Sequence, residues 1–171
     1  MAETQNRIIR RHSPAAGKDV NPMRLSISPR GLSLIQKFEG CRLKAYQDSI
    51  GLWTIGYGHT SGVSEGQTIT QTQADAFLKA DCANAENAVS RYDDRYHWNQ
   101  NQFDALVSFT FNCGSRNLRT LLNNGQRTVS EISAKIPAYN KAGGKVLKGL
   151  ARRRAAEKEL FDAPAGNERC P

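Results

Sequence analysis

The sequence predicts an α+β protein that is mainly α-helical, with one small β-hairpin sheet near the start of its folded part. Apolar residues recur at helical spacing over most of the chain, and short alternating runs between glycines occur only within residues 43–58. No internal repeat is present. With 171 residues, 39% of them hydrophobic, the chain is long enough to form one compact unit with two lobes.

Proline, glycine and capping residues predict the first elements of the chain. Residues 1–27 mix charge, Pro and Gly without periodicity, which predicts a flexible basic arm. Ser28-Pro29 then resembles a helix N-cap followed by proline at the first helical position, and apolar residues repeat at helical spacing until Gly40. The pattern therefore predicts a short helix with Glu39 on its last turn.

The next segment changes period. Between residues 43 and 58, short alternating runs are separated by glycines, which predicts a β-hairpin. Thr70 and Gln73 then form a capping-box pattern that opens a long helix reaching about residue 92, long enough to connect two lobes. This gives a small α/β lobe over about 28–70, a connecting helix over about 70–92, a helical lobe over about 93–162, and a tail to 171. Within the helical lobe, helices are predicted at 99–113, 116–123, 129–139 and 147–161.

The formal charge of +8 is concentrated at the two ends of the chain. Residues 1–30 carry six Lys/Arg against two Asp/Glu, and residues 140–171 carry eight against four, whereas residues 31–139 carry ten of each. Such a distribution favours attraction to a polyanion, which could be nucleic acid, lipopolysaccharide or an anionic cell wall. Charge alone does not distinguish them.

Four scattered cysteines, Cys41, Cys82, Cys113 and Cys170, form no CxxC and have no histidine at metal-ligand spacing, so no metal site is expected. Free thiols are favoured over disulfides. For Cys41, two residues after Glu39, a buried inert thiol is favoured over a redox switch. No stretch approaches the about 20 apolar residues that span a bilayer, and the N-terminus has no apolar signal core, so we expect a soluble protein without its own export signal.

Two carboxyl groups suggest the chemistry. Glycoside hydrolysis normally uses one protonated carboxyl to donate to the leaving oxygen and one ionised carboxyl to activate water or stabilise positive charge. Glu39 at a helix end and Asp48 in the following hairpin would face each other across a cleft, and Thr54 on the next strand could hold a water between them.

The segment FEGCRLKAYQDSIGLWTIGYGHT, with Glu39-x8-Asp48-x5-Thr54, resembles the active-site segment of the phage lysozymes of glycoside hydrolase family 24. The likeness continues through FDALVSFTFNCG and KAGGKVLKGLARRRAAEKELF and covers about residues 28–162. It implies a lysozyme-like two-lobed fold and cleavage of the β-1,4 bond between N-acetylmuramic acid and N-acetylglucosamine in bacterial peptidoglycan. Glu39 would be the general acid, and Asp48 with Thr54 would position and activate water. Inverting and retaining routes both stay open.

The resemblance also carries expectations about neighbouring residues and biology. His59 would pair with Asp81 in a structural ion pair, and Asn112 and Phe111 would face the sugar-binding cleft, with a core role equally expected for Phe111. The protein would be a monomeric endolysin without a cofactor, made in the host bacterial cytoplasm. It would reach periplasmic peptidoglycan after holin-type membrane permeabilisation and cause host cell lysis.

The residues present also bear on alternative functions. A lytic transglycosylase would not need the water-handling pair Asp48 and Thr54, and a wall-binding protein with a dead site would not keep all three residues. A specific nucleic-acid-binding module would show a basic stripe with interleaved aromatics, which is absent. Arg152, Arg153 and Arg154 are expected on a solvated helix face beside Glu157, with one of them directed at the cleft. The basic arm is either a solvated tail or a contact for lipopolysaccharide or the anionic wall.

Overall fold

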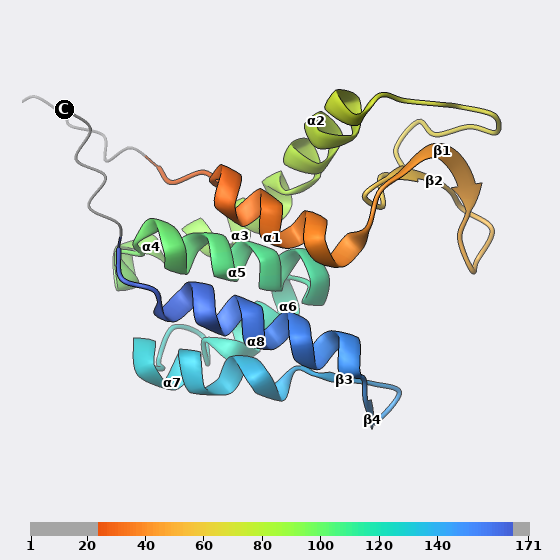
Figure 1. Ribbon diagram of the computed structural model, residues 1–171. Helices are drawn as coiled ribbons and strands as arrows, with labels where there is room; N and C mark the ends of the chain where they lie inside the picture. Colours follow the sequence, from red (N-terminus) through yellow and green to blue (C-terminus); the bar gives the residue numbers. More distant parts are fainter. Residues whose placement is uncertain (1–23, 166–171) are drawn as a thin grey trace, which may run out of the picture.

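The computed structural model describes residues 24–165 as a mainly helical protein with a small antiparallel hairpin (Figure 1), which confirms the predicted fold class. No helix among these residues is both long and apolar enough to cross a bilayer. The elements in chain order are α1 (Pro29–Glu39), β1 (Arg42–Gln47), β2 (Trp53–Gly56), α2 (Gln71–Asp81), α3 (Ala83–Ser90), α4 (Asp93–Tyr96), α5 (Gln100–Cys113), α6 (Ser115–Leu121), α7 (Val129–Lys135), the 3-10 turn η1 (Ile136–Ala138), β3 (Lys141–Ala142), β4 (Lys145–Val146) and α8 (Lys148–Asp162).

The start of α1 is fixed by its predicted cap. The Ser28 side chain accepts from the backbone N–H groups of Arg30 and Gly31 and donates to the buried carboxylate of Asp104 on α5. Of the predicted arm, residues 1–23 lie outside the described residues. Its end is not free, because Ile27 is only 4% exposed, belongs to the core, and donates its backbone N–H to Glu86. The packed part of the chain therefore begins before Ser28.

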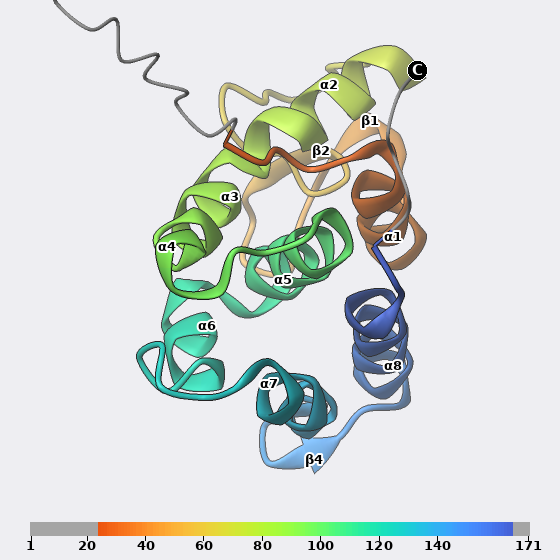
Figure 2. The same ribbon diagram turned by 90° about the vertical axis from the view of Figure 1, so that its left-hand side faces the viewer.

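Helix α5 forms the centre of the core. Every residue from Phe103 to Thr110 is buried, as expected for a helix that is surrounded by others. Figure 2 shows α5 in the middle, with α3 and α6 on one side and α1 and α8 on the other. The two sides of α5 therefore present separate surfaces.

The predicted hairpin is formed by β1 and β2, which pair antiparallel with Tyr46 opposite Thr54. Its turn places Gly51 at φ 83°, a left-handed conformation that favours glycine. In Figure 1 the hairpin lies apart from the helices around α5, and α2 leads the chain back to them.

The connecting helix and the region before α8 differ from the sequence expectations. The predicted single helix over about 70–92 is two helices, since α2 ends at Asp81 and α3 begins at Ala83; hydrogen bonds from Cys82 to Leu78 and from Glu86 to Cys82 continue across the junction. A second hairpin, β3 with β4, was not predicted. It turns through Gly143 and Gly144, both at positive φ, which is the geometry of tight hairpin turns.

Candidate active site

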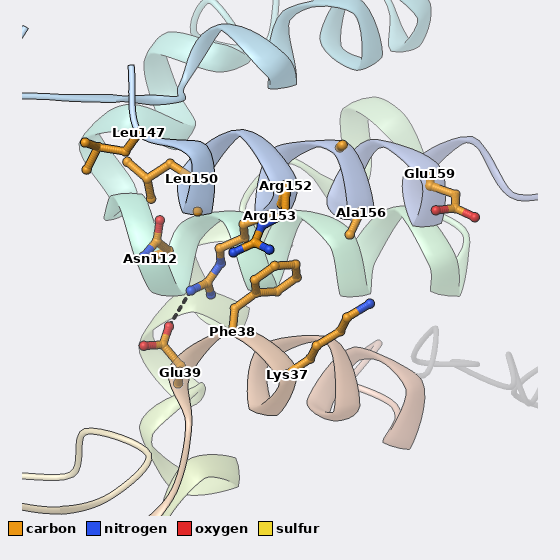
Figure 3. Close-up of a pocket in the computed structure, with 12 residues that line it drawn as sticks. Lys37, Phe38, Glu39, Asn112, Leu147, Leu150, Arg152, Arg153, Ala156 and Glu159 are labelled. Carbon is orange, nitrogen blue, oxygen red and sulfur yellow. Dashed lines mark hydrogen bonds and ion pairs between the residues drawn. The ribbon is translucent and has the colours of Figure 1, made fainter. Parts of the chain in front are cut away.

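Glu39, the predicted acid, lies at the C-terminal end of α1, directly before the capping residue Gly40. Its side chain is 25% exposed, and its Oε1 accepts a hydrogen bond from Nη1 of Arg153 at 2.5 Å. Arg153 comes from α8, 114 residues further along the chain, and its own side chain is 4% exposed. A buried guanidinium thus holds one oxygen of a partly exposed carboxylate (Figure 3).

Arg153 belongs to a buried charge network between α5 and α8. Its Nε donates to Oε1 of Glu157 at 3.1 Å, and Nε of Arg154 lies 3.2 Å from the other carboxylate oxygen. Ser108 also donates to Glu157 at 2.8 Å. Burial raises the pKa of Glu157 against the opposing influence of the two guanidinium groups and the hydroxyl.

The expected solvated face of the arginine run is therefore wrong for two of its three members. Arg153 is 3% exposed and Arg154 is fully buried, while only Arg152 is exposed. The physical reason is that α8 packs this side against α5, where Glu157 one turn later supplies the opposite charge. The residue that the sequence left undetermined, the arginine directed at the acid, is Arg153.

A pocket of about 860 Å³ lies between the end of α1, the end of α5 and one side of α8 from Gly149 to Glu159. Figure 3 shows Glu39 and Arg153 at one edge of it, Asn112 beside them, and Phe38 and Lys37 along one wall. The lining residues are Lys37, Phe38, Glu39, Asn112, Leu147, Gly149, Leu150, Arg152, Arg153, Ala155, Ala156 and Glu159.

Asn112 enters this pocket with a fixed orientation. Arg154 donates from Nη2 to Oδ1 of Asn112 at 2.7 Å, so the carbonyl end of the amide is occupied by a buried cation. The Nδ2 group stays available as a hydrogen-bond donor. Phe111, in contrast, packs against the hydrophobic core and does not line the pocket.

Asp48 and Thr54 lie together on the β1–β2 hairpin. Oδ1 of Asp48 accepts the backbone N–H groups of Ile50 and Leu52, each at 2.9 Å, and so shapes the turn. Thr54 is 4% exposed and donates its hydroxyl to the Leu52 carbonyl at 3.0 Å. Neither residue lines the pocket that contains Glu39, so the structure groups Glu39 with Asn112, and Asp48 with Thr54.

Comparison with known proteins gives the family. The family model described as phage lysozyme matches residues 36–157, which include Glu39, Asp48, Thr54, Asn112 and Arg153. The chain belongs to the phage lysozyme family. It is 42% identical over 147 residues to the endolysin of Lactococcus phage c2, covering 84% of this chain and 63% of that relative. The chain thus spans less than two thirds of that endolysin.

Two solved structures of high similarity support the fold. The muramidase domain of SpmX from Asticaccaulis excentricus superposes with a TM-score of 0.70 at 40% identity, covering 82% of this chain and all of that one. A mutant of the P22 lysozyme superposes with a TM-score of 0.72 at 36% identity, covering 81% of this chain and 99% of that one. The lysozyme-like fold expected from the resemblance is therefore confirmed.

In this phage lysozyme family member, the structure places His59 and Asp81 in contact. Nδ1 of His59 lies 2.9 Å from the Asp81 carboxylate, Nε2 lies 2.9 Å from the Ser61 carbonyl, and the ring stacks on Phe77. These contacts join the loop after β2 to α2. They fix where the hairpin stands relative to the connecting helix.

The thiols lie in three different environments, and none of the three described forms a disulfide. Cys41 is exposed, so the expected buried position is wrong; the chain runs along the surface where it leaves α1 for β1. Cys82 is fully buried, and burial raises the pKa of its thiol to about 12. Cys113 contacts the guanidinium of Arg154, and Cys170 lies outside the described residues.

Sequence reasoning missed Arg153 as the partner of Glu39. A local pattern was available, because Glu157 stands four residues after Arg153 and three after Arg154. That spacing supports an exposed pair as readily as a buried one. Only the packing of α8 on α5 decides between them.

Proposed function

We propose that this chain is an endolysin that hydrolyses the β-1,4 bond between N-acetylmuramic acid and N-acetylglucosamine in bacterial peptidoglycan, without a cofactor. The observation that carries the proposal is the position of Glu39. In a chain of the phage lysozyme family, it stands at the edge of a large pocket, held by the buried Arg153. The hairpin that directly follows carries Asp48 and Thr54.

Glu39 is the proposed general acid, which donates a proton to the glycosidic oxygen as the bond breaks. Arg153 occupies only Oε1 of this carboxyl. The second oxygen has no hydrogen-bond partner among the described residues and is the one proposed to face the substrate. A fixed first oxygen limits rotation of the group, which favours a productive orientation.

Asp48 and Thr54 are proposed to hold the attacking water. The Thr54 hydroxyl donates its hydrogen bond to the Leu52 carbonyl, so toward a water it acts as an acceptor. Oδ2 of Asp48 has no donor within residues 24–165, since both backbone contacts use Oδ1. A water that donates one proton to each keeps a lone pair directed at the anomeric carbon, and Asp48 removes the proton during attack.

Direct attack by this water inverts the anomeric configuration, whereas attack by Asp48 itself retains it. The two routes differ in the first product formed. NMR observation of the nascent reducing end during hydrolysis distinguishes them.

Replacement of Glu39 tests the proposal. Glu39→Gln keeps the acceptor for Arg153 but removes the acid, so lysis of chloroform-treated Gram-negative cells should fall by about 100-fold or more. Glu159→Gln is the matched control, because Glu159 lines the same pocket on its exposed side. Circular dichroism checks that both variants fold. A Glu39→Gln protein that lyses cells at the wild-type rate would overturn the assignment.

The water-handling pair has its own test. Thr54→Ser keeps the hydroxyl and should keep most of the activity, while Thr54→Val removes the acceptor at nearly constant volume and should lose it. Mass spectrometry of the muropeptides should show hydrated reducing ends. Anhydro ends would instead identify a lytic transglycosylase and exclude this mechanism.

The proposed site of action is the periplasm, reached by a monomeric enzyme from the host cytoplasm after holin-type permeabilisation. Purified enzyme added from outside should therefore lyse chloroform-treated cells and spare intact ones. The proposed contact of the basic arm with lipopolysaccharide or the wall is tested by deleting residues 1–23 only, because Ile27 belongs to the core. Unchanged wall binding after this deletion would leave the arm without that role.

A further inference from the structure

Two adjoining hollows lie between α3 and α6. One, of about 430 Å³, is lined by Arg24, Asn84, Asn87, Ala88, Arg91 and Ser115. The other, of about 380 Å³, is lined by Ala88, Arg91, Tyr92, Ser115, Arg116, Leu118 and Arg119. Because Ala88, Arg91 and Ser115 line both, the two hollows form one continuous surface, called here the arginine groove.

The charges of the arginine groove are all of one sign. Four arginines line it, namely Arg24, Arg91, Arg116 and Arg119, and no Asp or Glu does. All four are exposed, and none forms an ion pair with another described residue. The charge distribution along the sequence does not single out these arginines, because three of them fall within residues 31–139, where Lys/Arg and Asp/Glu are equal in number.

The groove is separate from the candidate active site. Figure 2 shows α3 and α6 on the side of α5 opposite α1 and α8, and the pocket of Glu39 lies between α1 and α8. A ligand in the groove would therefore leave the pocket free. The arginine groove and the pocket of Glu39 can therefore be occupied by ligands at the same time.

We propose that the arginine groove binds an acidic peptide, and that in its natural setting this peptide is the carboxylate-bearing stem peptide of peptidoglycan. This identity of the ligand rests on the proposed function. Guanidinium groups bind carboxylates through two parallel hydrogen bonds. Arg91 lies between the two hollows, so carboxylates at two positions along one short peptide could be held on either side of it.

The other polar groups favour a peptide over a bare phosphate. Asn84 and Asn87 carry amides, each of which both donates and accepts and so matches the N–H and C=O groups of a peptide bond. A phosphate at neutral pH offers mainly acceptors, with at most two O–H donors, and matches the paired donor and acceptor of each amide less well. The groove would hold the enzyme on insoluble wall while the glycan is cleaved on the other side of α5.

The experiment measures sedimentation with purified sacculi, using the full chain carrying Glu39→Gln so that the wall is not digested. In this background, Arg91→Gln, Arg116→Gln and Arg119→Gln are combined. We expect the triple variant to bind roughly tenfold more weakly at low salt, given up to about fivefold for each exposed ion pair. The matched control combines Lys79→Gln, Lys135→Gln and Lys141→Gln, three exposed positions with the same loss of charge, and should bind like the parent.

A second arm identifies the ligand. Free stem peptides, released from separate sacculi by an amidase and added in excess, should lower the sedimentation of the parent with intact sacculi to that of the triple arginine variant. Unchanged sedimentation in the presence of excess stem peptides would overturn the peptide assignment, as would tighter arginine-dependent binding to lipopolysaccharide vesicles or to DNA. Equal loss in the lysine control would show general electrostatics and also overturn it.

The remaining arm separates this inference from the proposed function. With Glu39 intact, the triple arginine variant should hydrolyse peptide-free glycan strands at the rate of the wild type. If the wild type releases no muropeptides, the proposed function fails whatever the binding result. If the wild type lyses walls and the arginines do not affect sedimentation, only the arginine groove proposal fails.

Discussion

Arginines on the two sides of α5 are used in opposite ways. Arg153 and Arg154 of α8 are buried and share one carboxylate, that of Glu157, whereas Arg91, Arg116 and Arg119 are exposed and have no ion-pair partner among the described residues. The difference lies in the local sequence. α8 offers a glutamate three and four residues after its arginines, while α6, which carries Arg116 and Arg119, contains no acidic residue.

The comparison shows when an arginine side chain can be buried and stabilise the fold. A buried charge is tolerated only if an opposite charge and further hydrogen bonds accompany it, so α8 can direct two arginines at α5 and α6 cannot. One of those buried arginines then holds Glu39, and the other holds Asn112. Arginines without such partners stay in water and are available to a ligand.

The largest expected effect on the free energy of unfolding comes from removing an arginine of the buried network around Glu157. Arg154→Met removes the cation but keeps an unbranched side chain, and leaves Glu157 with only one of its two guanidinium partners. The free energy of unfolding should fall by about 3–5 kcal/mol, because a buried pair loses one member. Urea unfolding followed by circular dichroism measures this loss.

The same substitution on the other side serves as the control. Arg119 is exposed, so Arg119→Met should change the free energy of unfolding by no more than about 0.5 kcal/mol. Similar losses in the two variants would show that burial does not separate the two sets of arginines. The contrast between buried arginines that stabilise the fold and exposed arginines that are available to a ligand would then be lost.

A smaller effect is expected where the buried network reaches the pocket. Asn112→Asp keeps an acceptor for Arg154 but removes the Nδ2 donor that faces the pocket. KM for peptidoglycan glycan should rise by about fivefold to tenfold, the cost of one hydrogen bond, with a smaller change in kcat. Steady-state kinetics on solubilised glycan gives both constants.

Asn124→Asp is its matched control, because Asn124 is exposed and lies outside the pocket. Its KM should equal that of the wild type. An unchanged KM in Asn112→Asp would mean that the orientation imposed by Arg154 does not serve substrate binding. The amide would then belong to the buried network alone.

How much of this was predictable depends on the distance between the partners along the chain. The cap at Ser28, the hairpin after Glu39 and the capping box at Thr70 are all formed, because each depends on residues a few positions apart. The second hairpin has a local pattern as well, because Gly143-Gly144 lie between the predicted helices at 129–139 and 147–161, but two glycines between helices indicate a loop as readily as a hairpin. The junction at Cys82 has neither Gly nor Pro to mark it.

The residues of the candidate site also differ in how far apart they lie along the chain. Glu39, Asp48 and Thr54 stand within one short segment and could be nominated from its resemblance to a family. The bond from Arg153 to Glu39 spans 114 residues, and the arginine groove gathers residues from three parts of the chain. Such groupings depend on how helices pack around α5, which no local spacing records.

The smallest expected effect concerns an exposed charge with a local partner. Glu131 closes the capping box of α7, where its carboxylate accepts from the backbone N–H and the hydroxyl of Thr128. The backbone hydrogen bond, followed by that from the hydroxyl, holds the pKa of Glu131 below its ordinary value of 4.5. Because the folded-state value is the lower one, the stabilisation is complete above the ordinary value and is lost as pH falls through the folded one.

Glu131→Gln keeps the capping geometry and removes only the charge. Its Tm should therefore lie slightly below that of the wild type at pH 7, and the difference should shrink as pH falls below the ordinary value of 4.5 and vanish below the lowered folded-state pKa, where the wild-type carboxylate is protonated too. Thermal melts of the two proteins across this range measure it. A difference that grows on acidification would mean that Glu131 does not contribute through its ionised form, and that even exposed charges here depend on more than their nearest partner.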